Sequence, residues 1–145
     1  YLAVLPGGAE YALYVSKEDY LFQSLHFNYV EVNNPAPLSM NVSLVKIQKD
    51  AAIVLNNIFF DFDKYELQDR SFTELNEMVK FLNSYPAVNI EISGHTDNQG
   101  KEEYNQQLSL RRATAVSDYL QSKGVAITRI FVKGFGSKRP ISPND

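Results

Sequence analysis

The stretch SFTELNEMVKFLNSYPAVNIEISG, residues 71–94, decides the fold because its apolar period changes from that of a helix to that of a strand. The first half has apolar side chains at three- and four-residue steps, which indicates one buried helical stripe. The second half alternates apolar and polar residues, which indicates a half-buried strand. The positions concerned are Phe72, Leu75, Val79 and Leu82 in the helix, and Val88, Ile90 and Ile92 in the strand.

Local signals mark both ends of this helix. Ser71 and Glu74 have the spacing of a capping box, in which the hydroxyl and the carboxylate bind free amides at a helix start. Tyr85 precedes Pro86, and the residue before a proline is pushed out of the helical region. We therefore predict a helix that begins with a side-chain cap at Ser71 and ends near Tyr85.

The alternation of strands and helices continues on both sides of this stretch. Residues 58–62 (IFFDF) predict a first strand, and a second helix is predicted from about Glu103 to Ser122, closed by a left-handed cap at Gly124. Residues 130–132 (IFV) predict a third strand. Residues 53–145 are thus expected to form a mixed α/β domain, a βαβαβ two-layer sandwich with right-handed crossovers.

Residues 1–48 have a different texture. Aromatic and β-branched residues alternate with others in three short runs, which predicts half-buried strands near residues 11–15, 25–30 and 40–44. We predict part of an all-β sandwich here, with the domain boundary at residues 46–52. Fewer than about fifty residues make a thin core, so an upstream portion of this sandwich is expected.

The composition excludes several classes of protein. The 145 residues carry a net charge of -3, whereas duplex nucleic acid requires a basic face. No apolar run reaches the roughly 18 residues of a membrane helix. The absence of cysteine removes disulfides and thiolate metal sites, and two histidines without a paired spacing do not suggest zinc. We expect neither a metal nor a cofactor.

A polar loop, GHTDNQG at residues 94–100, follows the second predicted strand. Ligand sites in α/β sheets favour the carboxyl ends of strands, and flanking glycines suit a tight loop that exposes amides and a carboxylate. From composition alone, however, a solvated turn is the more favoured interpretation.

Arg112 changes that balance, because it lies on or beside the predicted buried face of the second helix. A buried unpaired charge is costly, and the nearest acidic candidates are Asp97 and Asp63. A plain salt bridge, or an arginine whose stem packs while its head reaches solvent, would explain the position equally well. The residues predicted for this face are Leu108, Ala115, Val116 and Tyr119.

Catalytic interpretations of the same region are weaker. Ser93 and His95 stand on one strand end, and no strained nucleophile elbow surrounds the serine. Two of the acidic residues could form a pair for glycan cleavage, but an arginine beside Asp97 would keep that carboxylate ionised, which suits binding better than proton donation. We therefore expect no enzymatic activity. The acidic residues considered are Asp61, Asp63, Glu91 and Asp97.

Three motifs in order and spacing closely resemble the OmpA-like C-terminal domain: FFDFDK at 59–64, ISGHTD at 92–97 and YNQQLSLRRA at 104–113. Arg129 and KGFGS at 133–137 extend the match to about residues 53–145, and LNNIFF at 55–60 is similar to the Bacteroidota branch. Residues 1–48 resemble, more weakly, the later half of a carboxypeptidase-regulatory-like β-sandwich. The family usually continues into a last helix and strand with an Asn-Arg-Arg motif, whereas this sequence stops at Asp145.

The resemblance implies non-covalent binding of peptidoglycan by a domain on the periplasmic face of the outer membrane, at the diaminopimelate of the stem peptide. Asp97 matches the aspartate that takes the ligand's ammonium, and Arg112 matches the arginine that takes its carboxylate. Asn105, Asp63 and Thr96 match positions that line the pocket. The implied partners are the stem peptide and, through other parts of the protein, the outer membrane. The alternative is an interaction scaffold that docks an envelope protein or a second copy, as a homodimer, without binding the wall.

Overall fold

The computed structural model describes residues 5–28, 39 and 41–138. The chain divides into two compact units, Tyr1–Asn57 and Ile58–Asp145. Asn56 belongs to the first unit because its Nδ2 donates to the carbonyl oxygen of Ser24 at 2.7 Å. The division therefore falls later than residues 46–52. The domain limits 1–48 and 53–145 remain a prediction about where independent folding begins.

The first unit contains an antiparallel hairpin of β1 (Glu10–Val15) and β2 (Gln23–Asn28), in which Glu10 is opposite Asn28 and Val15 is opposite Gln23. The two strands predicted near residues 11–15 and 25–30 are confirmed as far as residue 28, while residues 29 and 30 lie outside the described part. Exposed and half-buried residues alternate over residues 25–28, but not in β1, where Leu13 is exposed. Leu21 and Phe22, just before β2, are the buried apolar residues of this unit.

The third predicted strand of the first unit does not form over residues 41–44, and Met40 lies outside the described residues. The following residues make one isolated antiparallel bridge, Tyr20 to Lys46, with Leu21 N donating to Val45 O at 2.7 Å. This segment thus touches the hairpin at its turn and does not extend along a strand, where a ladder of bonds would form. The described residues form a two-stranded hairpin, and the all-β sandwich remains a prediction.

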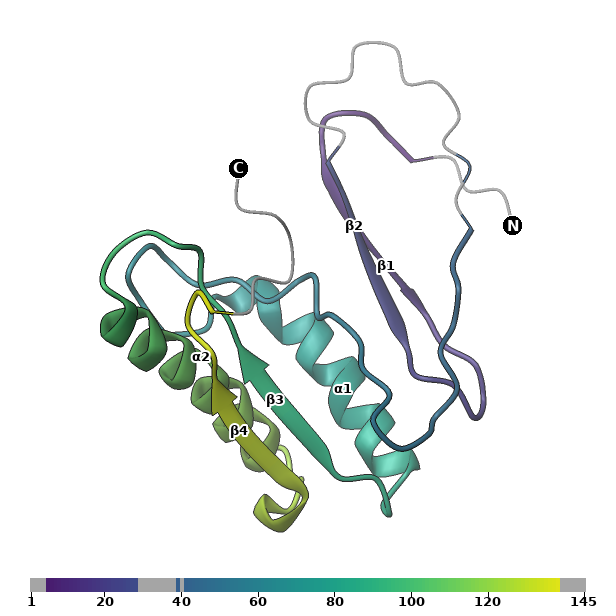
Figure 1. The fold of residues 1–145 in the computed structure, drawn as a ribbon. Helices are drawn as coiled ribbons and strands as arrows, with labels where there is room; N and C mark the ends of the chain where they lie inside the picture. Colours follow the sequence, from purple (N-terminus) through teal and green to yellow (C-terminus); the bar gives the residue numbers. More distant parts are fainter. Residues whose placement is uncertain (1–4, 29–38, 40, 139–145) are drawn as a thin grey trace. The chain divides into compact units, whose positions relative to one another are not determined.

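The second unit has two layers, with α1 (Phe72–Ser84) and α2 (Glu102–Ser122) packed with the parallel strands β3 (Ile90–Gly94) and β4 (Ile130–Gly134). Short 3₁₀ turns, η1 (Asp69–Ser71) and η2 (Ile127–Arg129), precede α1 and β4. In Figure 1 β4 lies in front of α2, which contacts both strands and also α1. The core is apolar and comprises Leu75, Met78, Leu82, Ala113, Val116, Leu120, Val125 and Ile130.

The outward face of this sheet is polar, apart from the exposed ring of Phe131. Glu91 and Ser93 of β3 are exposed, and the paired residues of β4, Phe131 and Lys133, are exposed beside them. Lys133 Nζ forms an ion pair with Glu91 Oε2 at 2.6 Å. Exposed positions alternate with buried or half-buried ones in both strands, which follows from the two-residue period of a strand with one covered face.

The predicted capping box at Ser71 is wrong. Ser71 has helical backbone angles and makes no side-chain cap. Its fully buried hydroxyl instead accepts a bond from Phe59 N at 2.8 Å and donates to Phe59 O at 3.2 Å. A contact with a residue twelve positions earlier has thus replaced the local motif.

The predicted first strand over residues 58–62 is also wrong. This segment makes one isolated bridge, Phe60 to Leu67, and then turns back on itself. Phe59 O accepts bonds from Gln68 N and from the Ser71 hydroxyl, so its backbone is satisfied by the start of α1 and not by a neighbouring strand. Within the described residues, the predicted βαβαβ order therefore reduces to helix, strand, helix, strand.

The helix α2 lies unusually close to the strands because glycine faces small residues. A Cβ built on Gly94 would stand 2.1 Å from the carbonyl oxygen of Ser109, and one on Gly134 would stand 2.6 Å from Leu110 N. The fully buried side chains of α2 are therefore mostly small or polar: Asn105, Ser109, Ala113, Val116, Ser117 and Leu120. The predicted face, with Leu108, Ala115 and Tyr119, is only its half-buried flank.

The ends of the helices agree better with the sequence. Helix α1 ends at Ser84, just before Tyr85, and Gly124 adopts a φ of 93° after α2, as a left-handed cap requires. Arg129 ties these parts together, because its guanidinium donates to the carbonyl oxygens of Leu82, Tyr85 and Val88 at 2.7–3.0 Å.

Candidate functional site

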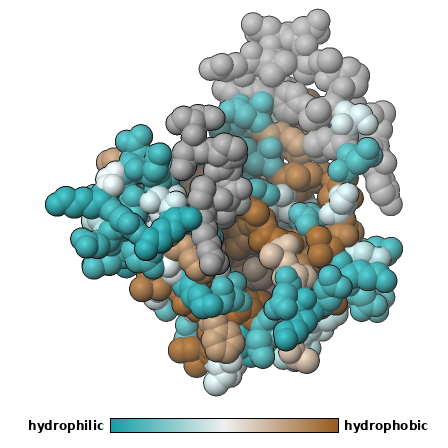
Figure 2. All heavy atoms as spheres, in the orientation of Figure 1, coloured by the Kyte–Doolittle hydropathy of each residue, from teal (hydrophilic) through white to brown (hydrophobic). Residues whose placement is uncertain are grey.

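Two loops and the start of α2 meet at the carboxyl end of β3 (Figure 1). The loop after β3 is joined to the end of β4 by Thr96 N, which donates to Gly136 O at 3.0 Å. The loop before α1 reaches α2 through a hydrogen bond from the Tyr104 hydroxyl to Asp63 Oδ1. Figure 2 shows hydrophilic side chains gathered in this region of the visible face. The structure thus brings the predicted site residues of both loops to the start of one helix.

Asp97 lies in an ordered turn and its side chain is exposed. Asp97 Oδ1 accepts a bond from Gln99 N at 3.2 Å, which leaves the other carboxylate oxygen, Oδ2, without a protein donor in the described part of the chain. The turn is held from below by Asn105, whose Nδ2 donates to Asp97 O at 3.3 Å and to Gln99 O at 2.9 Å.

Asn105 is 3% exposed, so its amide group is a buried support for the loop. Both hydrogens of its Nδ2 are directed at loop carbonyls, and a ligand would have to compete for them. Its predicted role as a residue that lines the pocket is therefore better described as a positioning role.

We expect Asn105→Ala to loosen this loop, since two carbonyl bonds would be lost and a small cavity left at a buried position. A loss of about 1–3 kcal/mol in the free energy of unfolding follows from removing a buried hydrogen-bonding group. Faster amide exchange at Gln99, relative to the middle of α2, would report the loosened turn. Exposed Gln107 offers the matched control Gln107→Ala, and equal exchange in both variants would contradict the role given to Asn105.

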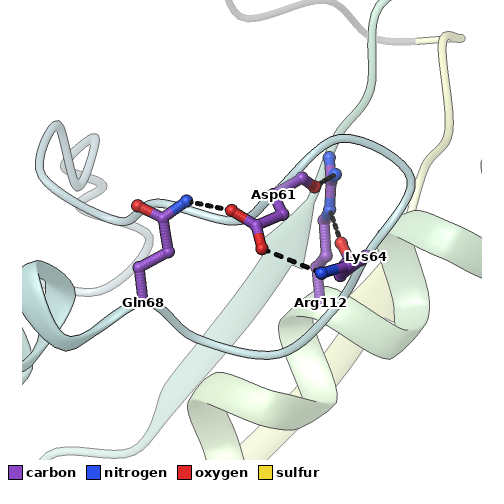
Figure 3. Close-up of polar contacts among 4 residues, drawn as sticks. All are labelled: Asp61, Lys64, Gln68 and Arg112. Carbon is purple, nitrogen blue, oxygen red and sulfur yellow. Dashed lines mark hydrogen bonds and ion pairs between the residues drawn. The ribbon is translucent and has the colours of Figure 1, made fainter.

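Arg112 is fixed by backbone carbonyl groups (Figure 3). Its Nε donates to Lys64 O at 2.9 Å and its Nη2 donates to Asp61 O at 3.3 Å. The guanidinium also lies 5.0 Å from the centroid of the Phe60 ring. A guanidinium has five N–H donors, so two of them hold the loop before α1 and three remain for other acceptors. The arginine is therefore held in place while part of its fork stays available.

The electrostatic surroundings of Arg112 are mixed. Burial lowers the pKa of its guanidinium, and the negative charges of Asp97, Tyr104 in its ionised form, and Asp63 oppose that shift. Arginine nevertheless stays protonated in proteins. Asp97 and Arg112 are thus close enough for their charges to interact, but across the described residues no direct ion pair joins them.

The loop from Asp61 to Lys64 is cross-linked from several sides. Asp61 accepts bonds from Lys64 Nζ at 3.1 Å and from Gln68 Nε2 at 2.7 Å (Figure 3), and these partners lower the pKa of its carboxyl group. Asp63 has a φ of 59°, a left-handed conformation that aspartate tolerates, and its hydrogen bond raises the pKa of the Tyr104 phenol. The loop therefore has a defined shape despite its exposure.

Two polar atoms beside Asp97 are buried with no hydrogen-bond partner among the described residues: His95 Nδ1 and Thr96 Oγ1. The His95 ring stacks on Phe135, with centroids 5.4 Å apart, so the loop is packed against the end of β4. Buried polar atoms are normally paired with protein or water. Thr96 thus has an unused hydroxyl at the place where the resemblance puts a residue of the pocket.

Ser93 and the candidate metal ligands can be placed within the described residues. Ser93 Oγ donates to Glu91 Oε1 at 3.2 Å, away from a nucleophile–histidine arrangement. No group of three or more potential metal ligands occurs in the part of the chain that is described. Among those same residues, no helix combines the length and apolarity needed to cross a membrane.

Some functional contacts could not be read from the sequence. The carbonyl groups of Asp61 and Lys64 that hold Arg112 are backbone atoms, which leave no trace in residue identity. Tyr104 had a signal, because it lies two helical turns before Arg112 and so shares its side of α2. That spacing places Tyr104 toward the same side of α2 as Arg112, but its contact with Asp63 depends on the tertiary fold.

The fold and the site together define a two-layer α/β domain with a polar site at the carboxyl end of a parallel strand pair. Residues 59–145 match the OmpA family, and the chain belongs to that family. A crystal structure of the peptidoglycan-associated lipoprotein from Burkholderia pseudomallei superposes with a TM-score of 0.56 at 35% identity, covering 59% of this chain and 72% of that one. The second unit thus has the OmpA-like mixed α/β fold.

Curated relatives are similar to between about 61% and 78% of the chain. The peptidoglycan-associated lipoprotein of Mesorhizobium japonicum is 35% identical over 117 residues, which cover 78% of this chain and 70% of that protein. Outer membrane porin F of Pseudomonas fluorescens is 42% identical over 88 residues, 61% of this chain but 27% of the porin. The chain therefore spans about a quarter of the porin. None of these three relatives is named for an enzymatic activity.

Proposed function

We propose that the second unit binds peptidoglycan without covalent attachment and ties an outer-membrane protein to the cell wall from the periplasmic side. One observation carries this proposal: Arg112 is held by two carbonyl groups, keeps three N–H donors available and has Asp97 within its electrostatic reach. The names of the relatives, which include peptidoglycan-associated lipoproteins, support the same partner.

The ligand group that fits is the zwitterionic end of diaminopimelate, which carries an ammonium and a carboxylate on one carbon. Asp97 would accept the ammonium with its free carboxylate oxygen, and Arg112 would take the carboxylate with its remaining donors. Thr96 would supply its unused hydroxyl, and Asp63 would add negative charge near the ammonium. Because Asp97 and Arg112 do not pair directly, a doubly charged group could lie between them and satisfy both.

The expected affinity is modest. Charge-assisted hydrogen bonds contribute about 1.5–3 kcal/mol each, and a few of them, offset by the entropy of association, correspond to micromolar to millimolar dissociation constants. Such affinity is sufficient for an anchor, because many copies face a polymeric wall at high effective concentration.

A pull-down with insoluble peptidoglycan tests the proposal. We expect the chain to sediment with the wall, and Asp97→Ala and Arg112→Ala to lose at least about 80% of that retention, since each removes one of two charge-assisted contacts. Asp118→Ala is a matched control, because Asp118 is an exposed aspartate further along α2. Equal retention of all four proteins would overturn wall binding through this site, and a lack of retention in all four would favour the interaction scaffold.

A further inference from the structure

A buried hydroxyl group on α2 lies behind the loop that carries Asp97. Ser109 is fully buried, and its Oγ accepts a hydrogen bond from Gly136 N at 2.9 Å. The same hydroxyl donates to the carbonyl oxygen of Gln106, one turn earlier on the helix, at 2.9 Å. The side chain of Ser109 therefore joins α2 to the turn that follows β4.

Gly136 transmits this support to the loop after β3. Its amide nitrogen donates to Ser109, and its carbonyl oxygen accepts a bond from Thr96 N at 3.0 Å. A Cβ built on Gly136 would stand 3.0 Å from Gln106 N, so the turn after β4 packs closely against α2. Two hydrogen bonds in series thus connect the buried hydroxyl to the residue directly before Asp97.

The loop is therefore held by α2 at two points. Asn105 holds the carbonyl group of Asp97, and Ser109, about one helical turn later, holds the residue before it through the two bonds in series. Arg112 follows Ser109 by three residues and so lies on a neighbouring part of the helix surface. One helix thus determines the position of Arg112 and the position of the loop that carries Asp97.

We propose that Ser109 is a positioning residue for ligand binding, which acts through Gly136 on the loop that carries Asp97. This inference rests on the proposed function and deepens it. The ammonium and the carboxylate of the proposed ligand group are attached to one carbon, so Asp97 and Arg112 can meet both charges only at a suitable separation. A loop that is held in advance also avoids the cost of being ordered on binding. Because Ser109 is fully buried, it acts without contacting the ligand.

Titration of the full chain with meso-diaminopimelate, followed by nuclear magnetic resonance, reports the dissociation constant and individual amide groups together. For Ser109→Ala we expect about five- to tenfold weaker binding. We also expect a changed chemical shift of the Thr96 amide proton in the ligand-free protein, since Gly136 loses its acceptor on α2. Ser117→Ala is the matched control, because Ser117 is a 4% exposed serine of α2 whose hydroxyl accepts a bond from Gln121 Nε2. The control should keep both the wild-type affinity and the wild-type shift of Thr96.

A second variant, Ser109→Cys, keeps the test decisive if Ser109→Ala does not fold. A thiol is a weaker acceptor than a hydroxyl group, so we expect binding about two- to fivefold weaker than that of the wild type. Circular dichroism establishes which variants are folded at the temperature of the titration. A serine with a merely structural role would lower the Tm of the variant without changing the dissociation constant of the folded protein.

The outcomes separate this inference from the proposed function. If the wild type does not bind the ligand, the proposed function itself fails and this inference fails with it. If Arg112→Ala loses binding while the folded Ser109 variants bind like the wild type, the site stands and the role of Ser109 is overturned. If Ser117→Ala weakens binding as much as Ser109→Ala, the effect is a general one of buried serines in α2, which also overturns the positioning role.

Discussion

Replacing Gly94 with alanine should destabilise the second unit more than any single change at the surface of the site. The added Cβ would stand 2.1 Å from the carbonyl oxygen of Ser109 and 2.8 Å from its carbonyl carbon, both of them backbone atoms of α2. A backbone cannot move aside as a flexible side chain can, so the whole helix must shift. We expect a loss of about 3 kcal/mol or more in the free energy of unfolding, at the upper end of overpacking effects.

Thermal unfolding followed by circular dichroism would measure this loss. For a domain of this size, about 3 kcal/mol corresponds to a fall in Tm of roughly 12–24 °C. Gly7→Ala is the matched control, since a Cβ on Gly7 meets nothing within 4 Å. A Gly94→Ala protein that melts within about 2 °C of the Gly7→Ala protein would show that α2 does not lie this close to β3.

Arg112→Lys should abolish most binding to peptidoglycan even though it preserves the charge. Arg112 reaches the carbonyl groups of Lys64 and Asp61 through two different nitrogens and still keeps donors for a ligand. A lysine has one ammonium on a flexible stem, so it would either hold the loop or bind the carboxylate, without the planar fork. We expect at least about tenfold weaker binding, equivalent to about 1.4 kcal/mol.

This substitution separates geometry from net charge, which the alanine variant does not. Arg111→Lys is the control, because Arg111 is exposed on the neighbouring position and its guanidinium lies 5.6 Å from the Tyr65 ring. Titration with meso-diaminopimelate is the measurement. If Arg112→Lys binds within twofold of the wild type, a positive charge is sufficient for binding, and the planar geometry of the guanidinium does not contribute to it.

The helices and the two paired strands of the second unit could be predicted because their signals are local. Helix α1 follows an apolar period and stops before a proline, and Gly124 marks the end of α2 by its backbone freedom alone. Strands β3 and β4 alternate exposed residues with half-buried or buried ones, a pattern that is sufficient to place the strands but does not show how they pair. Interactions between residues close in sequence were therefore sufficient to predict these helices and strands.

The errors share the opposite cause, since each depended on a distant partner. The capping box at Ser71 failed because the Ser71 hydroxyl bonds to both the N and the O of Phe59 and makes no cap bond to α1. The apolar run at 58–62 satisfied its backbone through the start of α1, which no periodicity reveals. Hydropathy also misplaced part of the buried face of α2, because the close contact with Gly94 and Gly134 selects side chains there for small size, as at Ser109 and Ala113.

The site was partly accessible from the sequence. The position of Arg112 beside a buried face raised the question of its partner, and Asp97 and Asp63 do contribute to its electrostatic surroundings. Arg112 is held in place by two carbonyl groups of the loop before α1. These partners could not be predicted, because every residue has a carbonyl group. Functional geometry made by the backbone becomes visible only in three dimensions.

The four bonds from Arg129 also have a consequence for how the chain matures during synthesis. Leu82, whose carbonyl accepts one of them, precedes Arg129 by 47 residues. At about 5–20 residues per second, the ribosome makes that arginine roughly 2–9 s after the leucine. The carbonyl groups at and after the end of α1 therefore lack these donors until translation has passed the second helix, so the contact between the end of α1 and the start of β4 is completed late in synthesis.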